Sequence, residues 1–365
     1  MTDRRTAILG ALTVAATAFT GTSVEAKKKK KKKCRPVCAG YQSCKKGRCV
    51  DTPVPNIFRT YASPDSTPYE GVTLIPGAMI AKDGDLYVIN RGAGNTDRDS
   101  IMVFSSDPRT GTLNFLRQFG EHGTGNSQMI QGSSLCFAGN YLLVADVDGH
   151  RIKVWYVNPD TGEATAQNQI GEQGTGVGQF LNPFGVAYSP AHQKAYVVQS
   201  HGIGWFDFNS TTGESGNHGI LFFSTMPDWP SGAEIVNDTL YFTDKDRGVL
   251  QIPINSDGTM STQWQPTTVT WPSGYGFAGP QGINYNGGRF YVANWDSPSF
   301  SDDFNYATQI FDLETDGTLN YIGALMYEDK HVYIKQYPQS TVVIGRWAYS
   351  SAFAAENVIS LFSAP

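Results

Sequence analysis

Short apolar runs that end in a polar or glycine residue recur along most of the chain. Each run has four mostly apolar residues, and successive copies are about fifty residues apart. The copies are Leu86–Asn90, Leu142–Asp146, Ala195–Gln199, Leu240–Asp244, Phe290–Asn294 and Thr341–Gly345. Runs of this length, rich in Val, Tyr and Phe and bounded by turn residues, are typical of β-strands. Six copies at a nearly constant spacing predict an internal repeat.

Each copy is surrounded by two further strand-like runs and, in five units, by a hairpin signal. A glycine begins the earlier run eight to ten residues before each of the first five copies: Gly77, Gly132, Gly185, Gly232 and Gly282. The sixth unit has His331-Val-Tyr-Ile in that place. The later run is followed by Thr-Gly or Asp-Gly, which favours a tight β-turn. We therefore expect each unit to be a four-stranded antiparallel sheet.

A single sheet of this size cannot bury both of its faces, whereas six sheets arranged radially can. The sixth unit lacks a fourth strand, because the sequence stops at Pro365 soon after its third run, Val358–Leu361. The segment Asn56–Tyr61 resembles the fourth strand of the first unit, Asn114–Phe119. Pairing this segment with the last unit would remove two exposed strand edges. The sequence thus predicts an all-β, six-bladed β-propeller that is closed by an N-terminal strand.

The first fifty residues differ in composition from the repeats. Residues 1–26 carry Arg4 and Arg5, then an uncharged stretch, then a small-residue ending, which together indicate a secretory signal peptide. No later window is apolar for long enough to be a transmembrane segment. We therefore expect a signal peptide over 1–26, a Lys-rich and disulfide-rich segment over 27–51, and a propeller over 52–365. The mature protein is expected to be secreted and extracellular.

Charge is divided unevenly between these parts. Residues 27–50 hold eleven Lys and Arg and no acid, whereas the chain from Asp51 onward holds 15 Lys and Arg against 31 Asp and Glu. An acidic body repels phosphates, so we expect no nucleic-acid partner. The lysine run Lys27–Lys33 predicts adhesion to an anionic envelope polymer, and so an association with the cell surface. A solubilising spacer is the alternative.

Four cysteines follow the lysine run within sixteen residues. They are Cys34, Cys38, Cys44 and Cys49. In an exported chain this density predicts two disulfides, with three connectivities open. A zinc site is less favoured, because the spacing lacks a C-x2-C pair and histidine. The fifth cysteine, Cys136, lies in an apolar strand pattern and is expected to be a buried, inert thiol.

Two glycine-rich connectors resemble the NHL-repeat family. They are Gly171-Glu-Gln-Gly-Thr-Gly-Val-Gly-Gln-Phe180 and a degenerate copy that starts at Gly120. Asp146–Trp155 is also similar to the family's Asp-x-x-Asn-x-Arg-Ile-x-Val-Phe, so the resemblance covers roughly residues 120 to 210. The Thr-Gly and Asp-Gly hairpins look like those of seven-bladed lactonase-type propellers, although six copies fill residues 56–365. These resemblances imply two enzymatic precedents, metal-dependent lactone hydrolases and amidating lyases.

In such propellers, the ends of the second strands meet at one rim of the central channel. Oxygen donors recur at that register: Asn90, Asp146, Asp244 and Asn294. Four converging carboxylate or amide oxygens suit a divalent cation, and Ca²⁺ is the candidate. The alternative is that these side chains only bond the backbone of their own turns.

Acid–base and ligand-binding candidates lie near the same rim in this arrangement. His331, His201 and Glu328 are the catalytic candidates, because such groups exchange protons near neutral pH. The ligand-binding candidates are Trp295, Trp347, Arg91 and Arg346. Aromatic rings beside polar groups suit carbohydrate or peptide ligands, although rings also pin long loops.

The pattern predicts a secreted, NHL-like propeller that acts as an extracellular binding module. Its partner would be an extracellular protein, peptide or carbohydrate. The alternative is a metal-dependent, lactonase-like hydrolase or lyase with its site at the channel rim. A propeller fold hosts both kinds of protein, so whether the chain is an enzyme stays open at the level of sequence.

Overall fold

A computed structural model gives the conformation of most of the chain. The residues that it describes are 42–45, 48–51, 59–61, 75–91, 99–225, 227, 229–272, 275–277, 279–294, 307–326, 337–353 and 358–363. The chain divides into two units, Met1–Val50 and Asp51–Pro365. No helix in the described ranges has the length and apolar character needed to cross a membrane.

The N-terminal unit contributes one described hairpin-like pair. In it, β1 (Gln42–Lys45) pairs with β2 (Arg48–Asp51), and Asp51 is the first residue of the second unit. The predicted signal peptide, the lysine run, Cys34 and Cys38 lie outside the described residues. So do the side chains of Cys44 and Cys49. The two disulfides therefore stay a prediction.

The first two blades of the second unit are four-stranded antiparallel sheets, each in sequence order. Their strands are β4 (Pro76–Lys82), β5 (Asp85–Asn90), β6 (Ser100–Ser106) and β7 (Leu113–Phe119), then β10 (Gly132–Ala138), β11 (Tyr141–Asp146), β12 (Arg151–Val157) and β13 (Ala164–Ile170). A short parallel pair, β8 (Glu121–His122) and β9 (Gln128–Met129), forms the connector between these blades.

Blades three and four repeat the same order. Their strands are β14 (Pro183–Ser189), β15 (Lys194–Gln199), β16 (Gly202–Phe208) and β17 (Ser215–Phe222), then β18 (Pro230–Val236), β19 (Thr239–Asp244), β20 (Gly248–Pro253) and β21 (Gln265–Pro266). The predicted Thr-Gly hairpins join the third and fourth strands, and Gly111 and Gly162 have φ of 71° and 70°. These positive φ values explain why glycine occupies the turns.

Blades five and six depart from that order in their outer strands. Blade five contains β23 (Pro280–Asn286), β24 (Arg289–Asn294), β25 (Ala307–Leu313) and β26 (Leu319–Met326), with β22 (Val269–Thr270) added in parallel outside β26. Blade six contains β27 (Tyr337–Ile344), β28 (Trp347–Phe353), β29 (Val358–Ser363) and β3 (Arg59–Tyr61). The described part of the chain therefore forms six sheets of four or five strands.

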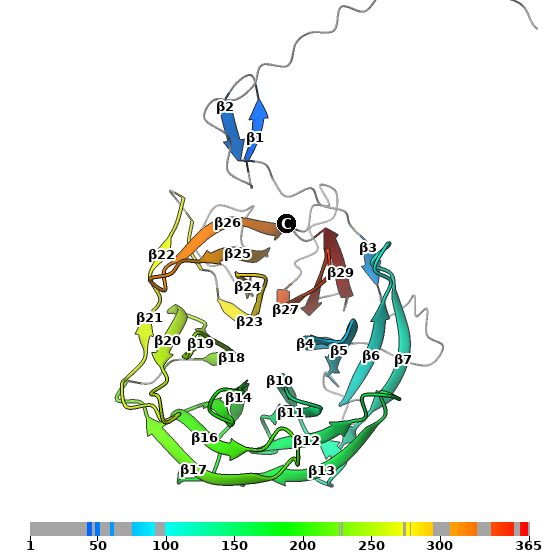
Figure 1. Cartoon of the computed structure of the whole chain (residues 1–365), viewed down its shortest axis with the longest axis vertical. Helices are drawn as coiled ribbons and strands as arrows, with labels where there is room; N and C mark the ends of the chain where they lie inside the picture. The colour runs from blue at the N-terminus through cyan, green and yellow to red at the C-terminus, as the bar shows by residue number, and fades with distance from the viewer. Residues whose placement is uncertain are drawn as a thin grey trace, which may run out of the picture. The chain divides into compact units, whose positions relative to one another are not determined.

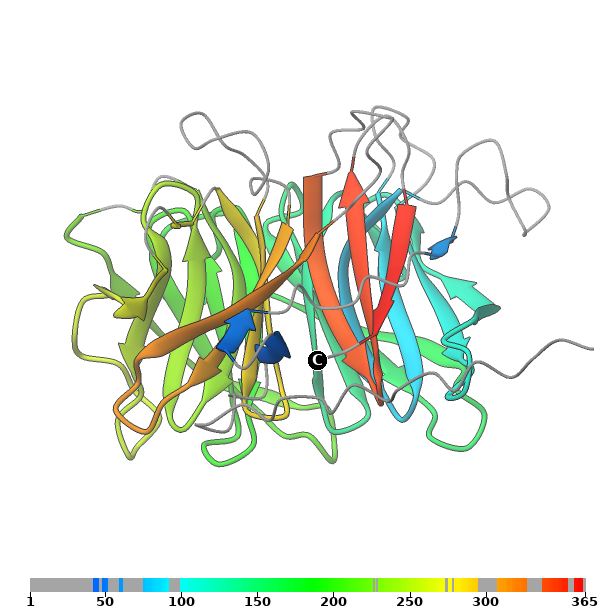
Figure 2. The ribbon, with the colours of Figure 1, turned by 90° about the horizontal axis from the view of Figure 1, so that it is seen from above.

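These sheets are arranged around a central opening, with the first strand of each blade innermost (Figure 1). The innermost strands contact one another in a closed series: β4 with β10, β10 with β14, β14 with β18, β18 with β23, β23 with β27, and β27 with β4. Figure 2 shows the strands running between the two rims of the ring. The predicted all-β propeller is confirmed.

Two of the recurrent glycines are explained by the narrowness of this ring. A Cβ atom at Gly282 would lie 2.2 Å from the backbone oxygen of Gln339, and one at Gly232 would lie 2.9 Å from that of Gln281. The neighbouring inner strands therefore approach too closely for any side chain at these positions. At these two positions, glycine is thus required by the packing of the inner strands.

Blade six is completed by the N-terminal segment, as the sequence predicts. Strand β3 pairs antiparallel with β29, and Tyr61 lies opposite Ile359. Leu361 on β29 is fully buried in a cluster that also includes residues of β4, β5 and β6. Backbone pairing thus joins the N-terminal segment to blade six, and apolar packing joins blade six to blade one.

The register predicted for blade six was wrong by one strand. Thr341–Gly345 was predicted to be the second strand. Residues 341–344 instead belong to the first strand, β27, and Gly345 lies in the turn that follows. The second strand is β28, which contains the fully buried Ser350 and Ser351. Their hydroxyls are bonded to Thr341 and to the carbonyl of Gly77, so polar residues occupy core positions. A search for apolar runs in the sequence therefore does not find this strand. The segment His331–Ile334 lies outside the described residues.

Candidate functional site

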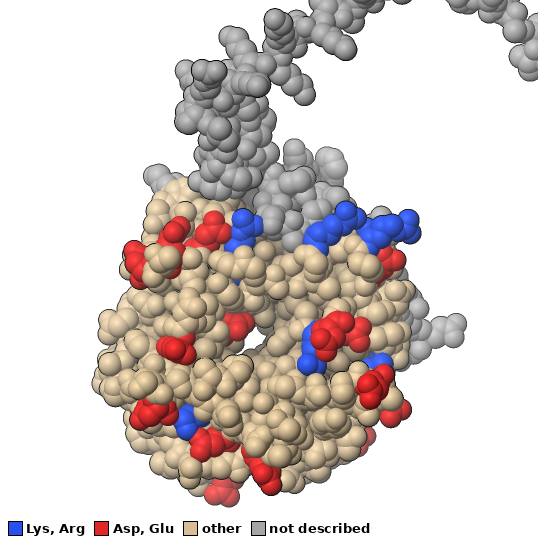
Figure 3. Space-filling model, in the orientation of Figure 1, with Lys and Arg blue, Asp and Glu red and all other residues tan. Residues whose placement is uncertain are grey.

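A cavity of about 160 Å³ lies in the central channel and is lined by residues of all six innermost strands. The space-filling view shows the opening at the centre of the ring, with acidic and basic side chains beside it (Figure 3). Its chemistry-bearing residues are Arg91, Cys136, Glu234, Asn284 and Ser340. The channel is the natural candidate site, because ligand sites are concave and combine apolar walls with a few polar groups.

Glu234 lies on β18 and is the acidic residue of the channel wall. Its Oε2 accepts a hydrogen bond from the Tyr285 amide and its Oε1 accepts one from the Ile235 amide, both at 3.3 Å. Burial disfavours the charged form and raises the pKa of this carboxyl to about 7, although the two amide bonds oppose the shift. A carboxyl with this pKa is divided between its acid and base forms at neutral pH, as acid–base catalysis requires.

The strand register places Cys136 and Asn284 at the same level of the channel as Glu234. Glu234 is opposite Tyr241, Cys136 opposite Leu143 and Asn284 opposite Tyr291, each three residues before the end of the second strand of its blade. Burial, and next the charge of Glu234, raise the pKa of the Cys136 thiol. The thiol is therefore held in its protonated form, in keeping with the inert cysteine expected from the sequence.

Arg91 follows β5 and lies at the mouth of the channel. Its Nε donates to the Gly132 carbonyl at 3.2 Å and its Nη1 donates to Gln339 Oε1 at 3.5 Å. Burial lowers the pKa of the guanidinium, and the negative charge of Asp99 partly offsets the shift. Arginine nevertheless stays protonated in proteins, so Arg91 places a fixed positive charge between blades one, two and six. This location fits its predicted ligand-binding role.

The polar residues at the ends of the second strands cap the entry to the first strands. In four blades their side-chain oxygens accept a hydrogen bond from an amide just before the innermost strand. The bonds run from Ile75 N to Asn90 Oδ1 (2.6 Å), Ile130 N to Asp146 Oδ1 (2.8 Å), Leu181 N to Gln199 Oε1 (2.8 Å) and Trp229 N to Asp244 Oδ2 (3.3 Å). This recurrence gives the register a structural role in these four blades.

Two of the four predicted metal ligands are also bonded to arginine. Asp146 Oδ2 accepts from Arg151 Nε at 2.9 Å, and Asp244 Oδ1 accepts from Arg247 Nη1 at 3.3 Å. A cation at either oxygen would have to displace a guanidinium, so this donor set fits a divalent ion poorly. Across the residues that the structure covers, no three His, Cys, Asp or Glu side chains are grouped to hold a metal. A shared Ca²⁺ stays a prediction, and no chemical step below depends on it.

The metal prediction is tested by the effect of ions on thermal unfolding. If Asn90, Asp146, Asp244 and Asn294 share a cation, calcium at 100 times its dissociation constant should stabilise the protein by about 2.7 kcal/mol. Asp244→Ala should abolish that shift. Melting curves with calcium, magnesium, manganese, zinc and EDTA measure the effect. Unchanged curves for the wild type in all five conditions would contradict a shared ion.

Of the three predicted catalytic residues, His201 is the one that the structure describes. His201 follows β15, stacks at 5.7 Å on the ring of Phe222 and is absent from the channel lining. Burial lowers its pKa, so the ring is neutral at pH 7. His331, Glu328 and Trp295 lie outside the described residues. The acid–base roles predicted for His201, His331 and Glu328 and the ligand-binding role predicted for Trp295 therefore stay predictions.

The placement predicted for Trp347 and Arg346 was wrong. Arg346 lies in the turn between β27 and β28, at the rim opposite Arg91, because the blade-six register is shifted by one strand. Trp347 is buried, and its indole nitrogen donates to the Pro108 carbonyl at 3.1 Å. Arg346 packs over the Trp347 ring and donates to the Arg109 carbonyl. Both side chains join blade six to blade one.

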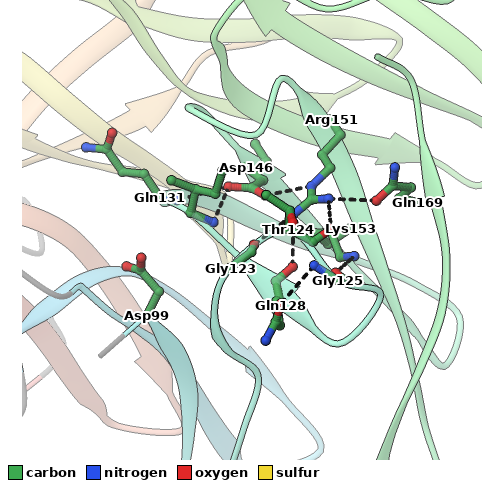
Figure 4. Close-up of polar contacts among 12 residues, drawn as sticks. Asp99, Gly123, Thr124, Gly125, Gln128, Gln131, Asp146, Arg151, Lys153 and Gln169 are labelled. Carbon is green, nitrogen blue, oxygen red and sulfur yellow. Dashed lines mark hydrogen bonds and ion pairs between the residues drawn. The ribbon is translucent and has the colours of Figure 1, made fainter. Parts of the chain in front are cut away.

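The glycine-rich connectors have matching hydrogen bonds. In the first, the Gly125 amide donates to Gln128 Oε1 at 2.8 Å; in the second, the Gly176 amide donates to Gln179 Oε1 at 3.1 Å. Figure 4 shows that the first connector folds around Arg151, which donates to the Thr124 and Gly123 carbonyls. Carbonyl oxygens of this connector therefore point at the Arg151 guanidinium. An anion-binding loop would instead point its backbone amides at the ligand.

Sequence reasoning missed Glu234. The available signal was a single acid inside the strand-like run Gly232-Ala-Glu-Ile-Val, at a register where other first strands have Ile80, Cys136 or Ala187. A charged side chain on an innermost strand either faces the channel or is buried against a neighbouring strand. Only the ring geometry shows that it lines a cavity.

Comparisons with known proteins give one partial family match and several structures of the same fold. Residues 66–177, less than a third of the chain, match a family model described as "Lactonase, 7-bladed beta-propeller". That stretch includes Arg91 and Cys136. The family description has seven blades, whereas the described residues of this chain form six. Among curated proteins, no match is found.

Solved structures share the fold at low sequence identity. A periplasmic gluconolactonase from Pseudomonas aeruginosa is 14% identical with a TM-score of 0.51, over 80% of this chain and 89% of that chain. A protein from Lactobacillus plantarum is 12% identical with a TM-score of 0.50, over 80% and 85%. U3-55K is 11% identical with a TM-score of 0.52, over 86% and 100%. Such similar scores show the propeller fold and do not select a function.

Proposed function

We propose that the chain hydrolyses lactones or related esters in its central channel, with Glu234 as the general base. The observation that carries this proposal is a channel carboxyl whose pKa is about 7. The partial match to a lactonase model and the fold shared with a gluconolactonase support the same chemistry. This is the hydrolase alternative of the sequence analysis, without a metal in the reaction.

In the proposed reaction, ionised Glu234 accepts a proton from a water molecule while the water oxygen attacks the carbonyl carbon. The ring carbon–oxygen bond then breaks, and the leaving oxygen takes the proton back from Glu234. The product is a hydroxy acid, and the carboxylate is regenerated. Arg91 at the channel mouth attracts and binds an anionic group of the substrate.

The pH dependence of turnover tests this role. Glu234 acts in its ionised form, so the rate should rise tenfold per pH unit below about pH 7 and become constant above it. The measurement is hydrolysis of glucono-δ-lactone, δ-valerolactone and p-nitrophenyl acetate, corrected for the reaction without enzyme. No turnover of any of them would contradict the proposal and favour the extracellular binding module. Turnover that is independent of pH through this range would exclude Glu234 as the base.

Export, adhesion through the lysine run and the NHL relationship remain predictions. The lysine run precedes the described residues, and the lactonase match reaches only the first part of the NHL-like segment. A hydrolase with a polybasic tail would act on substrates near an anionic surface. Adhesion through the lysine run and hydrolysis in the channel are therefore compatible proposals.

A further inference from the structure

Trp229 is the most exposed aromatic side chain among the large exposed apolar residues of the described chain, with 61% of its surface accessible. It lies immediately before β18, the strand that carries Glu234. Its amide donates to Asp244 Oδ2 at 3.3 Å, so Trp229 takes part in the cap of blade four. An exposed indole offers a flat surface to a ligand.

Phe184 forms the second part of this surface. The two ring centroids are 6.4 Å apart and the planes are inclined by 57°. Phe184 lies on β14, and its carbonyl accepts a hydrogen bond from Ser133, a residue that lines the channel. Ser231, two residues after Trp229, lines the channel as well. The aromatic pair therefore lies where the innermost strands of blades three and four begin, next to residues that line the cavity, while the two rings themselves are outside its lining.

The register of β18 and β19 gives the distance between this surface and the proposed base. Pro230 is opposite Asp244 and Glu234 is opposite Tyr241, so the two levels are three residues apart along β19. Three strand residues span about 10 Å, and Trp229 is one residue farther out. A single six-membered lactone ring spans roughly half of that length, so a substrate with two linked rings matches the separation of the two backbone levels better than one ring does.

The wall between the two levels carries polar residues beside apolar ones. It includes Ser133, Ser134, Ser231, Gln281, Gln339 and Ser340, with Met79 and Ile283 among the apolar residues. The hydroxyls of Ser133, Ser134 and Ser340 bond to neighbouring inner strands, so the polar groups offered to a hydroxylated ligand are those of Ser231, Gln281 and Gln339. An aromatic ring at the end of such a wall fits the apolar face of a second sugar ring.

We infer that Trp229, supported by Phe184, forms a distal subsite for the second ring of an oligosaccharide lactone, whose lactone ring reacts beside Glu234. This inference rests on the proposed lactone hydrolysis and adds the substrate class. The Trp229 side chain is a specificity residue, since it contacts the part of the substrate that does not react.

The test compares glucono-δ-lactone with cellobiono-δ-lactone, which carries one additional glucosyl ring. We expect kcat/KM to be at least about tenfold higher for the disaccharide lactone, because the second ring adds binding energy. Trp229→Ala should remove most of this preference through KM, while Trp229→Phe should keep it. The matched control is Leu116→Ala, an exposed apolar residue on the outer strand β7, which should leave both values unchanged.

Three outcomes would overturn the subsite. Equal losses for both lactones in Trp229→Ala would indicate a structural role. A preference for δ-dodecalactone that disappears in the same variant would indicate an apolar chain in place of a sugar. If the wild type hydrolyses neither sugar lactone, the proposed lactone hydrolysis is contradicted. Calorimetric titration with cellobionic acid then tests the distal subsite separately. Binding that Trp229→Ala abolishes would support it, and no binding would overturn it.

Discussion

Glu234→Gln should lower kcat for lactone hydrolysis by a factor of about 10² to 10⁴, the usual contribution of general acid–base catalysis. Glutamine keeps the size of the side chain and can still occupy the space beside Tyr285 and Ile235, but it cannot accept a proton from water. Because the substitution changes only the reacting step, KM should change far less than kcat. Steady-state kinetics at pH values above the pKa of about 7 measure both quantities.

The stability of the same variant separates lost chemistry from lost folding. The pKa of Glu234 is raised in the folded state from 4.5 to about 7, so between these values the folded protein binds more protons than the unfolded chain. The free energy of unfolding that this group contributes therefore falls as pH rises from 4.5 to 7. Neutral glutamine avoids that loss, and the variant should melt no lower than the wild type above pH 7.

The matched control for this prediction is Glu163→Gln, an exposed carboxyl in the hairpin between β12 and β13. It removes one negative charge from the same protein, far from the channel lining. Its kcat should equal that of the wild type. If Glu234→Gln retains full activity, the channel carboxyl is not the base, whatever the substrate.

The fold could be predicted from the sequence because its signals are local. The turn glycines, such as Gly111, and the inner-strand glycines, such as Gly282, each satisfy a steric requirement that only glycine meets. The similarity of Asn56–Tyr61 to Asn114–Phe119 predicted the closing strand, and the pairing of β3 with β29 confirmed it. Repetition makes such signals reliable, since each blade supplies an independent copy.

The sixth blade shows where local signals end. Ser350 and Ser351 can be buried because Thr341 donates a hydrogen bond to the Ser350 hydroxyl and the Gly77 carbonyl accepts one from Ser351. Those partners come from another strand and, for Gly77, from the other end of the chain. A buried hydroxyl with a distant partner looks like a loop residue in the sequence, so the strand was assigned to the wrong segment.

The candidate site was harder to predict because the same residue types serve structure and chemistry. Asp146 and Asp244 end strands at the channel rim, which suits metal binding, yet their oxygens accept bonds from backbone amides. Glu234, in contrast, lies in an ordinary strand, and its raised pKa arises from burial within the ring. Because strands of several blades together create this buried environment, the sequence around Glu234 gives little sign of it.

Arg151 carries the largest stability effect that we expect outside the channel. The side chain is 5% exposed and makes five hydrogen bonds, which Figure 4 shows reaching Asp146, Gln169 and the connector between blades one and two. Asp146 is fully buried. Arg151→Met should lower the free energy of unfolding by about 3–5 kcal/mol, because it leaves a buried carboxylate and several carbonyls without their donor.

Urea unfolding of Arg151→Met and of a matched variant, Arg117→Met, measures this effect. Arg117 is partly exposed and donates to the Gly162 carbonyl at 2.6 Å, so its loss should cost about 0.5–1.5 kcal/mol. Adding Asp146→Asn to Arg151→Met should recover part of the larger loss, since a neutral amide is less costly to bury than an unpaired carboxylate. Equal losses of unfolding free energy in the two arginine variants would show that the connector folds without the Arg151 guanidinium. The NHL-like glycine pattern alone would then be sufficient to specify it.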